Sequence, residues 1–314
     1  MLKALFIQLM NRKKSNAWIA LELLLVFCVS WYMVDYFFVI SYNYSLPSYL
    51  NTNHTWQVNI TQYPSDHPEY KEDENTPEQT ETNYNRILNY IRSYPGVTDL
   101  SVSFNRSTPG SDRFDNKNFG IPTDTSKSCW VRSITIDPLS DYFGVFGFSE
   151  ENGRKKVSIQ DYEWGKPNSV VINKLAASQL FPDGNAMGKT IFDINRTEQI
   201  YEIVGIVDNT KRIIAERPEA LCFFQNPLDA STIQRAEISI RIDPEINDKI
   251  FLTAFAQDME NNLRIGNFYF LSAESYNEKV EQHNELSGYN ISNRTHLYLM
   301  AFFLVNVILA VFKV

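Results

Sequence analysis

Apolar residues concentrate at the two ends of the 314-residue chain, whereas the middle alternates short apolar runs with long polar stretches. Residues 17–40 are nearly all apolar and would form a helix of roughly 36 Å, against a bilayer hydrocarbon core of about 30 Å. A basic cluster at residues 12–14 precedes this run. Because basic residues favour the cytoplasmic side, the pattern predicts a retained transmembrane helix over 17–40 and a cytoplasmic N-terminus. A buried helix of a soluble domain is the alternative.

The regions flanking this helix complete the predicted membrane part. Residues 1–16 place apolar side chains at helical spacing and predict an amphipathic elbow in the cytoplasmic interface of the lipid bilayer. A second apolar run, 297–312, corresponds to roughly 24 Å of helix, which is shorter than a full span, and Lys313 follows it. We expect a second transmembrane helix over 297–314 that is either marginal or incomplete, and we favour a natural chain that continues further.

The polar middle, residues 41–296, is expected to lie outside the cytoplasm and to mix strands with helices. Alternating apolar positions predict strands at 56–61, 100–104, 170–172, 200–207, 238–242 and 267–271. Helical spacing predicts helices at 84–91, 173–180, from 243 onward with Ile246, Ile250, Ala254 and Met259 buried, and at 274–286. The polar stretches 65–82 and 105–128 predict loops. The result is an α+β domain with a strand–helix–strand unit at each end and a β-rich insert between them.

Composition and charge exclude two classes of protein. The aromatic content of 14% excludes general disorder. The chain carries 29 basic and 37 acidic side chains, a net charge of −8, so no basic face is available to neutralise phosphates. We therefore expect no nucleic-acid partner.

The residue types that commonly serve in catalysis, metal binding or phosphate binding show no recognisable motif in this sequence. The four histidines, His54, His67, His283 and His296, lack partners at metal-ligand spacing, and His54 and His67, which lie in polar stretches, are interpreted as surface residues. The stretch from Gly184 to Thr190 resembles a phosphate-binding loop, but it has three residues between its glycines instead of four and is interpreted as a turn. The sequence therefore predicts no catalytic residue, no metal and no cofactor.

Cysteines are few, and one pairing stays open. Cys28 lies in the first apolar segment, whereas Cys129 and Cys222 lie in the polar middle. The last two could form a disulfide in an oxidising compartment, but the sequence does not establish that they are close.

Three stretches carry a resemblance to a known family. Residues 170–191 read VVINKLAASQLFPDGNAMGKTI, residues 134–148 read ITIDPLSDYFGVFGF, and residues 201–210 read YEIVGIVDNT. Their motifs and their order resemble the MacB-type periplasmic core domain of FtsX-like ABC transporter permeases. The resemblance extends over essentially the whole chain. The matching residues, which we interpret as structural, are Asn173, Phe181, Pro182, Gly184, Asn185, Gly188, Lys189, Gly205, Asp208, Tyr142 and Phe143.

The resemblance implies a division of the chain. After the elbow (1–16) and the first membrane helix (17–40), an α/β subdomain would comprise 41–135 and 233–296, the latter including a stalk helix. A mainly β subdomain would be inserted at 136–232, and the second membrane helix would follow at 297–314. Gly184 and Gly188 would permit a tight turn, Pro182 would end a helix, and Gly205 would relieve steric crowding in a strand.

The resemblance also implies a function and partners. Such permeases have four membrane helices, form dimers in the inner membrane and couple ATP hydrolysis to movements of their periplasmic domains, which export or extract substrates. This chain has only the first half of that membrane domain and no nucleotide-binding domain, so the ATPase would be a separate cytoplasmic subunit. A second permease chain and a periplasmic or outer-membrane protein would be further partners. The alternative is a two-span sensor or binding module without transport activity, and a membrane-anchored enzyme has no residues to support it.

Overall fold

The computed structural model describes residues 13–46, 50–105, 107–111, 115–150, 155–211, 216–286 and 289–312. Contacts divide the chain into two units, Pro47–His283 and the two terminal segments Met1–Leu46 and Asn284–Val314. Most of the predicted amphipathic elbow lies outside the described residues, and only its last four positions are described, as the start of helix α2.

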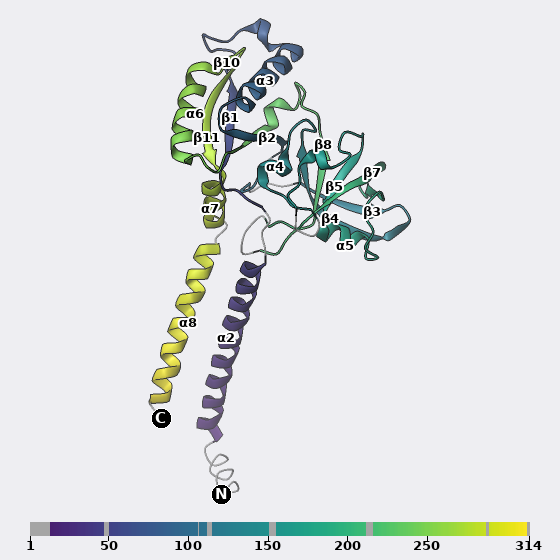
Figure 1. Ribbon diagram of the computed structural model, residues 1–314. Helices are drawn as coiled ribbons and strands as arrows, with labels where there is room; N and C mark the ends of the chain where they lie inside the picture. Colours follow the sequence, from purple (N-terminus) through teal and green to yellow (C-terminus); the bar gives the residue numbers. More distant parts are fainter. Residues whose placement is uncertain are drawn as a thin grey trace. The chain divides into compact units, whose positions relative to one another are not determined.

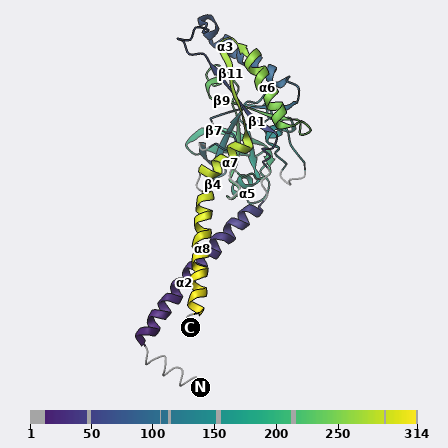
Figure 2. The same cartoon turned by 90° about the vertical axis from the view of Figure 1, so that its left-hand side faces the viewer.

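The terminal unit consists of two helices, α2 (Lys13–Ser45) and α8 (Tyr289–Phe312) (Figures 1 and 2). The 22 residues Leu24–Ser45 of α2 are long and apolar enough to cross a membrane, and large apolar side chains such as Phe27 and Phe38 are exposed along them. Within the described residues, the apolar part of α8 is only Arg294–Val305, which is shorter than a span. The predicted first apolar helix is confirmed, whereas the predicted second span stays a prediction.

The two helices contact each other through aromatic and polar side chains. The rings of Tyr36 and His296 stack with their centroids 3.7 Å apart. The Tyr32 hydroxyl lies 3.1 Å from His296 Nε2, and the hydroxyls of Tyr36 and Ser292 are 3.2 Å apart. His296 therefore packs between the two helices.

The large unit, Pro47–His283, contains one sheet in the order β10-β11-β1-β9-β2-β4-β3-β6-β7-β5-β8 (Figure 1). Its first part, the sheet half, has the antiparallel strands β1 (Thr55–Gln62), β2 (Val97–Phe104), β9 (Ala236–Ile242), β10 (Arg264–Ile265) and β11 (Phe268–Ser275). Helix α3 (Pro77–Arg92) connects β1 to β2, and α6 (Asp248–Asn262) follows β9. These are the two predicted strand–helix–strand units, and their strands interleave in one sheet.

Both helices of the sheet half cover the same face of the sheet (Figures 1 and 2). Ile87 and Ile91 of α3 and Phe255 of α6 are fully buried in one cluster with Val102 and Ile240 of the strands. The predicted helix over 84–91 is confirmed, and Thr76 caps it by accepting a hydrogen bond from the Gln79 amide.

The second part, the barrel half, is a closed ring of six strands. Its strands are β3 (Asp115–Ile121), β4 (Asp124–Ile136), β5 (Ser169–Asn173), β6 (Thr190–Asp193), β7 (Arg196–Val207) and β8 (Leu221–Gln225). They pair in the order β4-β3-β6-β7-β5-β8, and a parallel pairing of β8 with β4 closes the ring. The short helices are α4 (Tyr142–Phe146) and α5 (Lys174–Leu180), and single 3-10 turns occur at Glu72–Asn75, Ile159–Asp161 and Ile233–Arg235.

Alternate side chains of the barrel strands pack into two separate hydrophobic clusters. One cluster takes residues from all six strands and from α5, so it fills the inside of the barrel. The other takes Ile136, Val171 and Phe223 from the outer face and packs them against α4. Adjacent residues such as Val170 and Val171 belong to different clusters, as the period-2 geometry of a strand requires. The outer cluster also contains Tyr276, the first residue of α7 (Tyr276–Leu286), and so includes the point where the chain leaves the sheet half.

Two predicted loops are partly wrong. Residues 65–82 include the start of α3, and 105–128 include β3 and the first part of β4. The alternation in β3 is hidden because its first residues, Asp115 to Asn118, are polar and not buried, and only Phe119, Gly120 and Ile121 are buried.

The prediction for the last helix of the sheet half is also wrong at its start. The helix begins at Asp248, capped by Asn247, and its buried residues are Phe251, Phe255 and Met259. Ile250 is 71% exposed. Asp243 instead forms a turn, in which its carboxylate accepts a hydrogen bond from the Glu245 amide. Because the start was misplaced, the expected buried stripe was Ile246, Ile250, Ala254 and Met259, and only Met259 of these four residues is buried.

Candidate functional site

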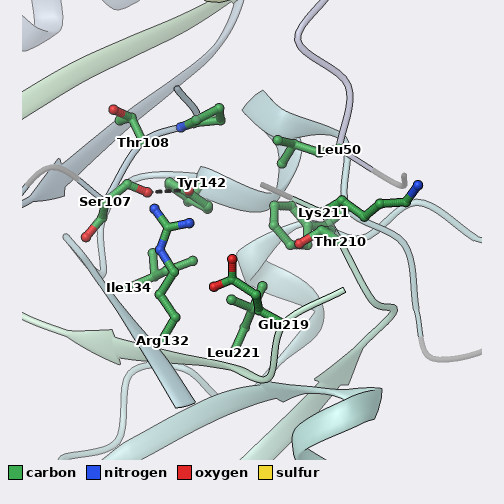
Figure 3. Close-up of a pocket in the computed structure, with 12 residues that line it drawn as sticks. Leu50, Ser107, Thr108, Arg132, Ile134, Tyr142, Thr210, Lys211, Glu219 and Leu221 are labelled. Carbon is green, nitrogen blue, oxygen red and sulfur yellow. Dashed lines mark hydrogen bonds between the residues drawn. The ribbon is translucent and has the colours of Figure 1, made fainter. Parts of the chain in front are cut away.

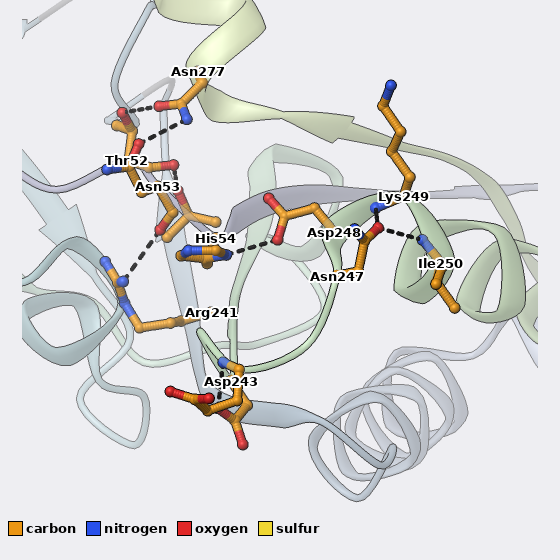
Figure 4. A network of polar contacts seen from close by, with 12 residues as sticks. Thr52, Asn53, His54, Arg241, Asp243, Asn247, Asp248, Lys249, Ile250 and Asn277 are labelled. Carbon is orange, nitrogen blue, oxygen red and sulfur yellow. Dashed lines mark hydrogen bonds and ion pairs between the residues drawn. The ribbon is translucent and has the colours of Figure 1, made fainter.

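The segment before β1 and the start of α7 meet in one hydrogen-bonded junction (Figure 4). Along the chain, these two segments connect the large unit to α2 and to α8. The Thr52 hydroxyl donates a 2.5 Å hydrogen bond to Asn277 Oδ1, and Asn277 Nδ2 donates a 2.9 Å bond to Asn53 Oδ1. These bonds hold the entry segment, residues 51–53, by which the chain enters the large unit, to the exit segment, residues 276–277, by which it leaves.

Arg241 on β9 ties the entry segment to α4. Its Nε donates to the Val145 carbonyl at 2.7 Å, Nη2 donates to the Asn51 carbonyl at 2.7 Å, and Nη1 donates to the Asn53 carbonyl at 3.2 Å. Figure 4 shows Arg241 beside the segment that contains Asn53. Partial burial lowers the pKa of Arg241, and the nearby Asp99 carboxylate opposes this shift. The guanidinium stays charged because arginine keeps its proton at any physiological pH. One side chain thus makes three charge-assisted hydrogen bonds to backbone groups of two segments.

Tyr276 anchors the exit segment to β9 and α4. Its side chain is fully buried, its hydroxyl lies 2.7 Å from the Ser239 hydroxyl on β9, and its ring packs edge-on against Phe146 of α4. Burial raises the pKa of Tyr276 well above its ordinary value, so the phenol is neutral and available as a hydrogen-bond donor. Helix α7 therefore starts from the core where β9 and α4 meet.

The junction extends to the N-terminus of α6 through His54. His54 has a backbone φ of 56°, and its Nδ1 lies 2.6 Å from Asp248 Oδ1, the first residue of α6 (Figure 4). Next to it, Asn247 caps α6 by accepting hydrogen bonds from the amides of Lys249 and Ile250. His54 is therefore a junction residue, which corrects its interpretation as an ordinary surface histidine.

A small cavity lies beside the junction. Its volume is about 30 Å³, and Arg132, Tyr142 and Glu219 face it (Figure 3). The Tyr142 hydroxyl donates to the Ser107 carbonyl at 2.8 Å. Since a single water needs roughly 10–15 Å³ of such volume, this cavity has room for about two or three waters and is too small for a substrate. Across the described residues, no group of three or more His, Cys, Asp or Glu could hold a metal ion.

The residues singled out by the sequence motifs do not form one site. Tyr142 and Phe143 are buried in the outer cluster, with Asp141 capping α4. Phe181 ends α5 and is followed by the exposed Pro182, Gly184 and Asn185. Asp208 is buried at the end of β7, where its amide donates to the Ser149 carbonyl. Of the motif residues, Phe181, Gly188 and Lys189 line one open pocket at an end of the barrel, and the others lie elsewhere around the barrel.

The glycines of the motifs have different roles. Gly184 and Gly188 have φ values of 87° and 71°, and a Cβ at either position would meet no atom within 4 Å, so the backbone conformation alone favours glycine there. At Gly205 a Cβ would collide with the ring of Tyr162, so close packing requires this glycine.

Asn173 makes three side-chain hydrogen bonds to backbone groups. Its Oδ1 accepts from the amides of Ala176 at 3.1 Å and Leu221 at 2.9 Å, and its Nδ2 donates to the Glu219 carbonyl at 2.7 Å. The side chain is fully buried and joins the start of α5 to β8. The predicted helix cap at Asn173 is confirmed.

Asn173→Ala is expected to lower the free energy of unfolding by about 2–3 kcal/mol, because the substitution removes a helix cap and leaves buried amides unpaired. Denaturant unfolding of the full chain measures this. The control, Asn185→Ala in the exposed turn, is expected to change stability by less than about 0.5 kcal/mol. Equal effects of the two substitutions would contradict this role of Asn173.

Cys129 and Cys222 are buried free thiols. Cys222 on β8 lies opposite Ser133 of β4 in the strand pairing, four residues beyond Cys129 along that strand. Burial raises the pKa of Cys129 to about 11 and the pKa of Cys222 well above its ordinary value. The disulfide that the sequence left open is not formed in this structure.

Both thiols are expected to resist labelling in the folded protein. A pKa raised from 9.0 to about 11 lowers the thiolate fraction at pH 8 by about a hundredfold, and only the thiolate reacts. In a Cys28→Ser background, DTNB should label Cys129 and Cys222 rapidly only after guanidinium unfolds the chain. Rapid labelling of the native protein at pH 8 would show that the thiols are accessible.

An α/β unit whose entry and exit are clamped together, attached to an apolar helix, is typical of the extracytoplasmic part of a membrane protein. The family model described as MacB-like periplasmic core domain matches residues 40–257. The chain belongs to this family, the periplasmic domain of ABC transporter permeases, and the resemblance drawn from the motifs is confirmed.

Three solved structures are similar to this chain. The periplasmic region of MacB from Actinobacillus actinomycetemcomitans is 13% identical, with a TM-score of 0.40, and the match covers 74% of this chain and 94% of that chain. A domain of a putative permease protein from Porphyromonas gingivalis is 10% identical, with a TM-score of 0.43 and coverages of 72% and 92%. The extracellular domain of the noncanonic ABC-type transporter YknZ from Gram-positive bacteria is 14% identical, with a TM-score of 0.37 and coverages of 69% and 100%. No curated protein matches the chain.

The sequence did not single out Arg241, His54, Tyr276 or Asn277. Arg241 occupies the polar side of an alternating strand, between Ile240 and Ile242, which is ordinary for a half-exposed strand. Its three acceptors are backbone carbonyls about 96 to 190 positions away, and backbone groups carry no sequence signal.

Proposed function

We propose that the chain is the N-terminal part of the permease subunit of an ABC-type transporter, and that the junction transmits movement between its membrane helices and its periplasmic unit. ATP binding and hydrolysis take place on a separate cytoplasmic ATPase, and the chain itself is not an enzyme. The N-terminus is cytoplasmic, α8 belongs to the second membrane helix, and two permease chains act as a dimer. Family membership supports a permease over a two-span sensor.

The observation that carries the proposal is the joint anchoring of both membrane connections. Arg241 holds the entry segment, Tyr276 holds the exit segment, and Asn277 bonds directly to the entry segment. A displacement of either connection must therefore move β9 and α4 together with it, because close-packed and hydrogen-bonded contacts transmit displacement.

We further propose that the sheet half and the barrel half act as two subdomains. Their cores are separate, and the outer cluster around α4 and Tyr276 lies between them. We keep the second boundary at residue 232, and the proposal is supported by the change from the barrel core to the sheet-half core near this position. Because β3 and β4 contribute to the barrel core, the first boundary is better placed near residue 105 than at 136. Movement of one half against the other would move substrates or displace a periplasmic partner protein.

Reconstitution of the subunit with its ATPase tests the proposal. The subunit that contains this chain is expected to bind the ATPase and to stimulate its ATP hydrolysis in lipid nanodiscs. Thr52→Val combined with Asn277→Leu, which removes the direct bonds between entry and exit, should leave ATPase binding intact and reduce the stimulation several-fold. A subunit that binds no ATPase would contradict the permease assignment.

A further inference from the structure

Helix α2 carries a carboxylate inside its apolar stretch. Asp35 lies near the middle of Leu24–Ser45, the part of α2 that is long and apolar enough to cross a membrane. Its side chain is exposed, and among the described residues it has no hydrogen-bond or ion-pair partner. A carboxylate in the hydrocarbon core is costly, and such groups face a cation, another helix or water. Asp35 therefore requires a polar partner from outside the described chain.

The contacts between α2 and α8 fix the level of Asp35 relative to α8. Tyr36, the next residue, stacks on the ring of His296 with centroids 3.7 Å apart, and its hydroxyl lies 3.2 Å from the Ser292 hydroxyl. The residue of α8 midway between Ser292 and His296 is Arg294. Asp35 and Arg294 therefore lie at the same level along the two helices, to within about one turn of 5.4 Å.

Asp35 and Arg294 do not pair within one chain. Arg294 follows Ser292 and precedes His296 by two residues, so it lies about 200° around α8 from both and points away from α2. Asp35 lies about 100° around α2 from Tyr36, to one side of the contact with α8. Arg294 is exposed and, within the described ranges, has no carboxylate partner. The helix pair thus presents one anion and one cation on separate outer faces at one depth.

The surroundings of both charges are apolar. Large exposed side chains share the faces of these two residues: Leu24, Trp31, Val39 and Tyr42 on α2, and Leu297, Tyr298 and Val305 on α8. Lipid and another membrane helix are both compatible with such apolar surfaces, so the apolar residues alone do not choose between them. The charges do choose, because a helix can supply the opposite charge and an interhelical polar contact, whereas lipid tails cannot.

We propose that α2 and α8 pack against the same two helices of a second copy, with Asp35 of each copy bound to Arg294 of the other. This rests on the proposed function, which takes the permease to be a dimer, and it identifies the membrane surface that joins the two chains. A twofold axis along the membrane normal leaves depth unchanged, so reciprocal pairing requires both residues to lie at one level, as they do. A second copy supplies both missing charges at that level.

Charge exchange tests the pairing. Two differently tagged copies of the full subunit are co-expressed, and co-purification in lipid nanodiscs measures their association. Asp35→Arg alone and Arg294→Asp alone should each weaken self-association at least about fivefold, because each brings like charges together in both pairs. An Asp35→Arg copy mixed with an Arg294→Asp copy should associate as the wild type does, since both pairs then join opposite charges. Asp183→Arg, at an exposed turn of the barrel half, is the matched control and should change nothing.

Disulfide cross-linking tests the geometry without changing charge at both residues of one chain. One tagged copy carries Asp35→Cys and the other Arg294→Cys, both in a Cys28→Ser background, and oxidation should join them. Cys129 and Cys222 are buried and do not compete. Cys28 provides the control, because it is exposed on nearly the same face as Asp35 but about 10 Å further along the helix. Arg294→Cys in a chain that retains Cys28 should give no cross-link to it.

The outcomes separate this proposal from the proposed function. Restored association in the mixed pair would exclude a salt bridge inside one chain and would show that both variants fold and insert. Unchanged association of the single variants, no restoration on mixing, or cross-linking of Cys28 as efficient as that of Asp35→Cys would overturn the pairing. In each of these cases a wild-type dimer that binds the ATPase leaves the proposed function intact. A wild-type subunit that does not self-associate would contradict both.

Discussion

Replacing Arg241 by methionine is expected to lower the free energy of unfolding by about 2–4 kcal/mol. Methionine retains the apolar stem of the side chain but leaves the carbonyls of Asn51, Asn53 and Val145 without their charged donor. Hydrogen bonds to charged groups contribute about 1.5–3 kcal/mol each, and partial access of water to the Asn51 and Asn53 carbonyls reduces the sum. Denaturant unfolding of the full chain measures the loss.

The effect should be specific to this arginine. Arg264→Met is the matched control, because Arg264 is 60% exposed and its contact with Glu69 is 3.5 Å long, and it should change stability by less than about 0.5 kcal/mol. Arg241→Lys should recover only part of the loss, since an ammonium cannot reach three carbonyls in the geometry of a guanidinium. Equal stability of the two methionine variants would contradict the role given to Arg241.

Replacing Phe143 by alanine is expected to lower the free energy of unfolding by about 3–5 kcal/mol. The side chain is fully buried in the outer cluster, where its ring packs against Phe223 at 4.9 Å and Phe148 at 5.4 Å between ring centroids. The substitution leaves a cavity between α4 and the outer wall of the barrel, and such cavities add to the loss of apolar burial.

Leu139→Ala is the control for this prediction. Leu139 precedes α4 by only three residues but is 87% exposed, so its truncation should cost less than about 0.5 kcal/mol. Thermal or denaturant unfolding compares the two variants. If Phe143→Ala were as stable as Leu139→Ala, the outer cluster would not be the packed contact between the two halves that the account requires.

Periodicity predicted the elements that bury a continuous apolar face. Strand β9 alternates Ile238, Ile240 and Ile242, and α3 spaces Ile87 and Ile91 one turn apart, so each pattern has a single interpretation. The cap at Asn173 was also predictable, because a short polar side chain before an apolar helix satisfies its free amides.

The elements that were missed have apolar positions too few or too irregular to reveal a period. Strand β3 buries only its last three residues, so its polar first half resembles a loop. Closure of the barrel depends on the parallel pairing of β4 with β8, which lie about 90 residues apart and carry no shared motif. Long-range pairing of this kind is set by the packing of the whole core and not by either strand alone.

The junction could not be predicted for a different reason. Its bonds run from Arg241 to backbone carbonyls and between the amides of Asn53 and Asn277, groups that are common in any polar loop. The motifs instead drew attention to residues such as Gly184 and Asn185, which lie in an exposed turn. The motifs therefore indicated the family, whereas the junction residues could be identified only from the folded structure.

The central claim is that ATP-driven movement reaches the periplasmic unit through the junction. Electron–electron distance measurements between spin labels at Gln257→Cys on α6 and Asn185→Cys on the barrel half, in a Cys28→Ser background, test it most directly. The subunit is held with its ATPase in nanodiscs, with and without ATP. The account predicts that ATP shifts the distance distribution and that Arg241→Met abolishes the shift while the ATPase remains bound. Identical distributions with and without ATP, in a complex that hydrolyses ATP, would contradict it.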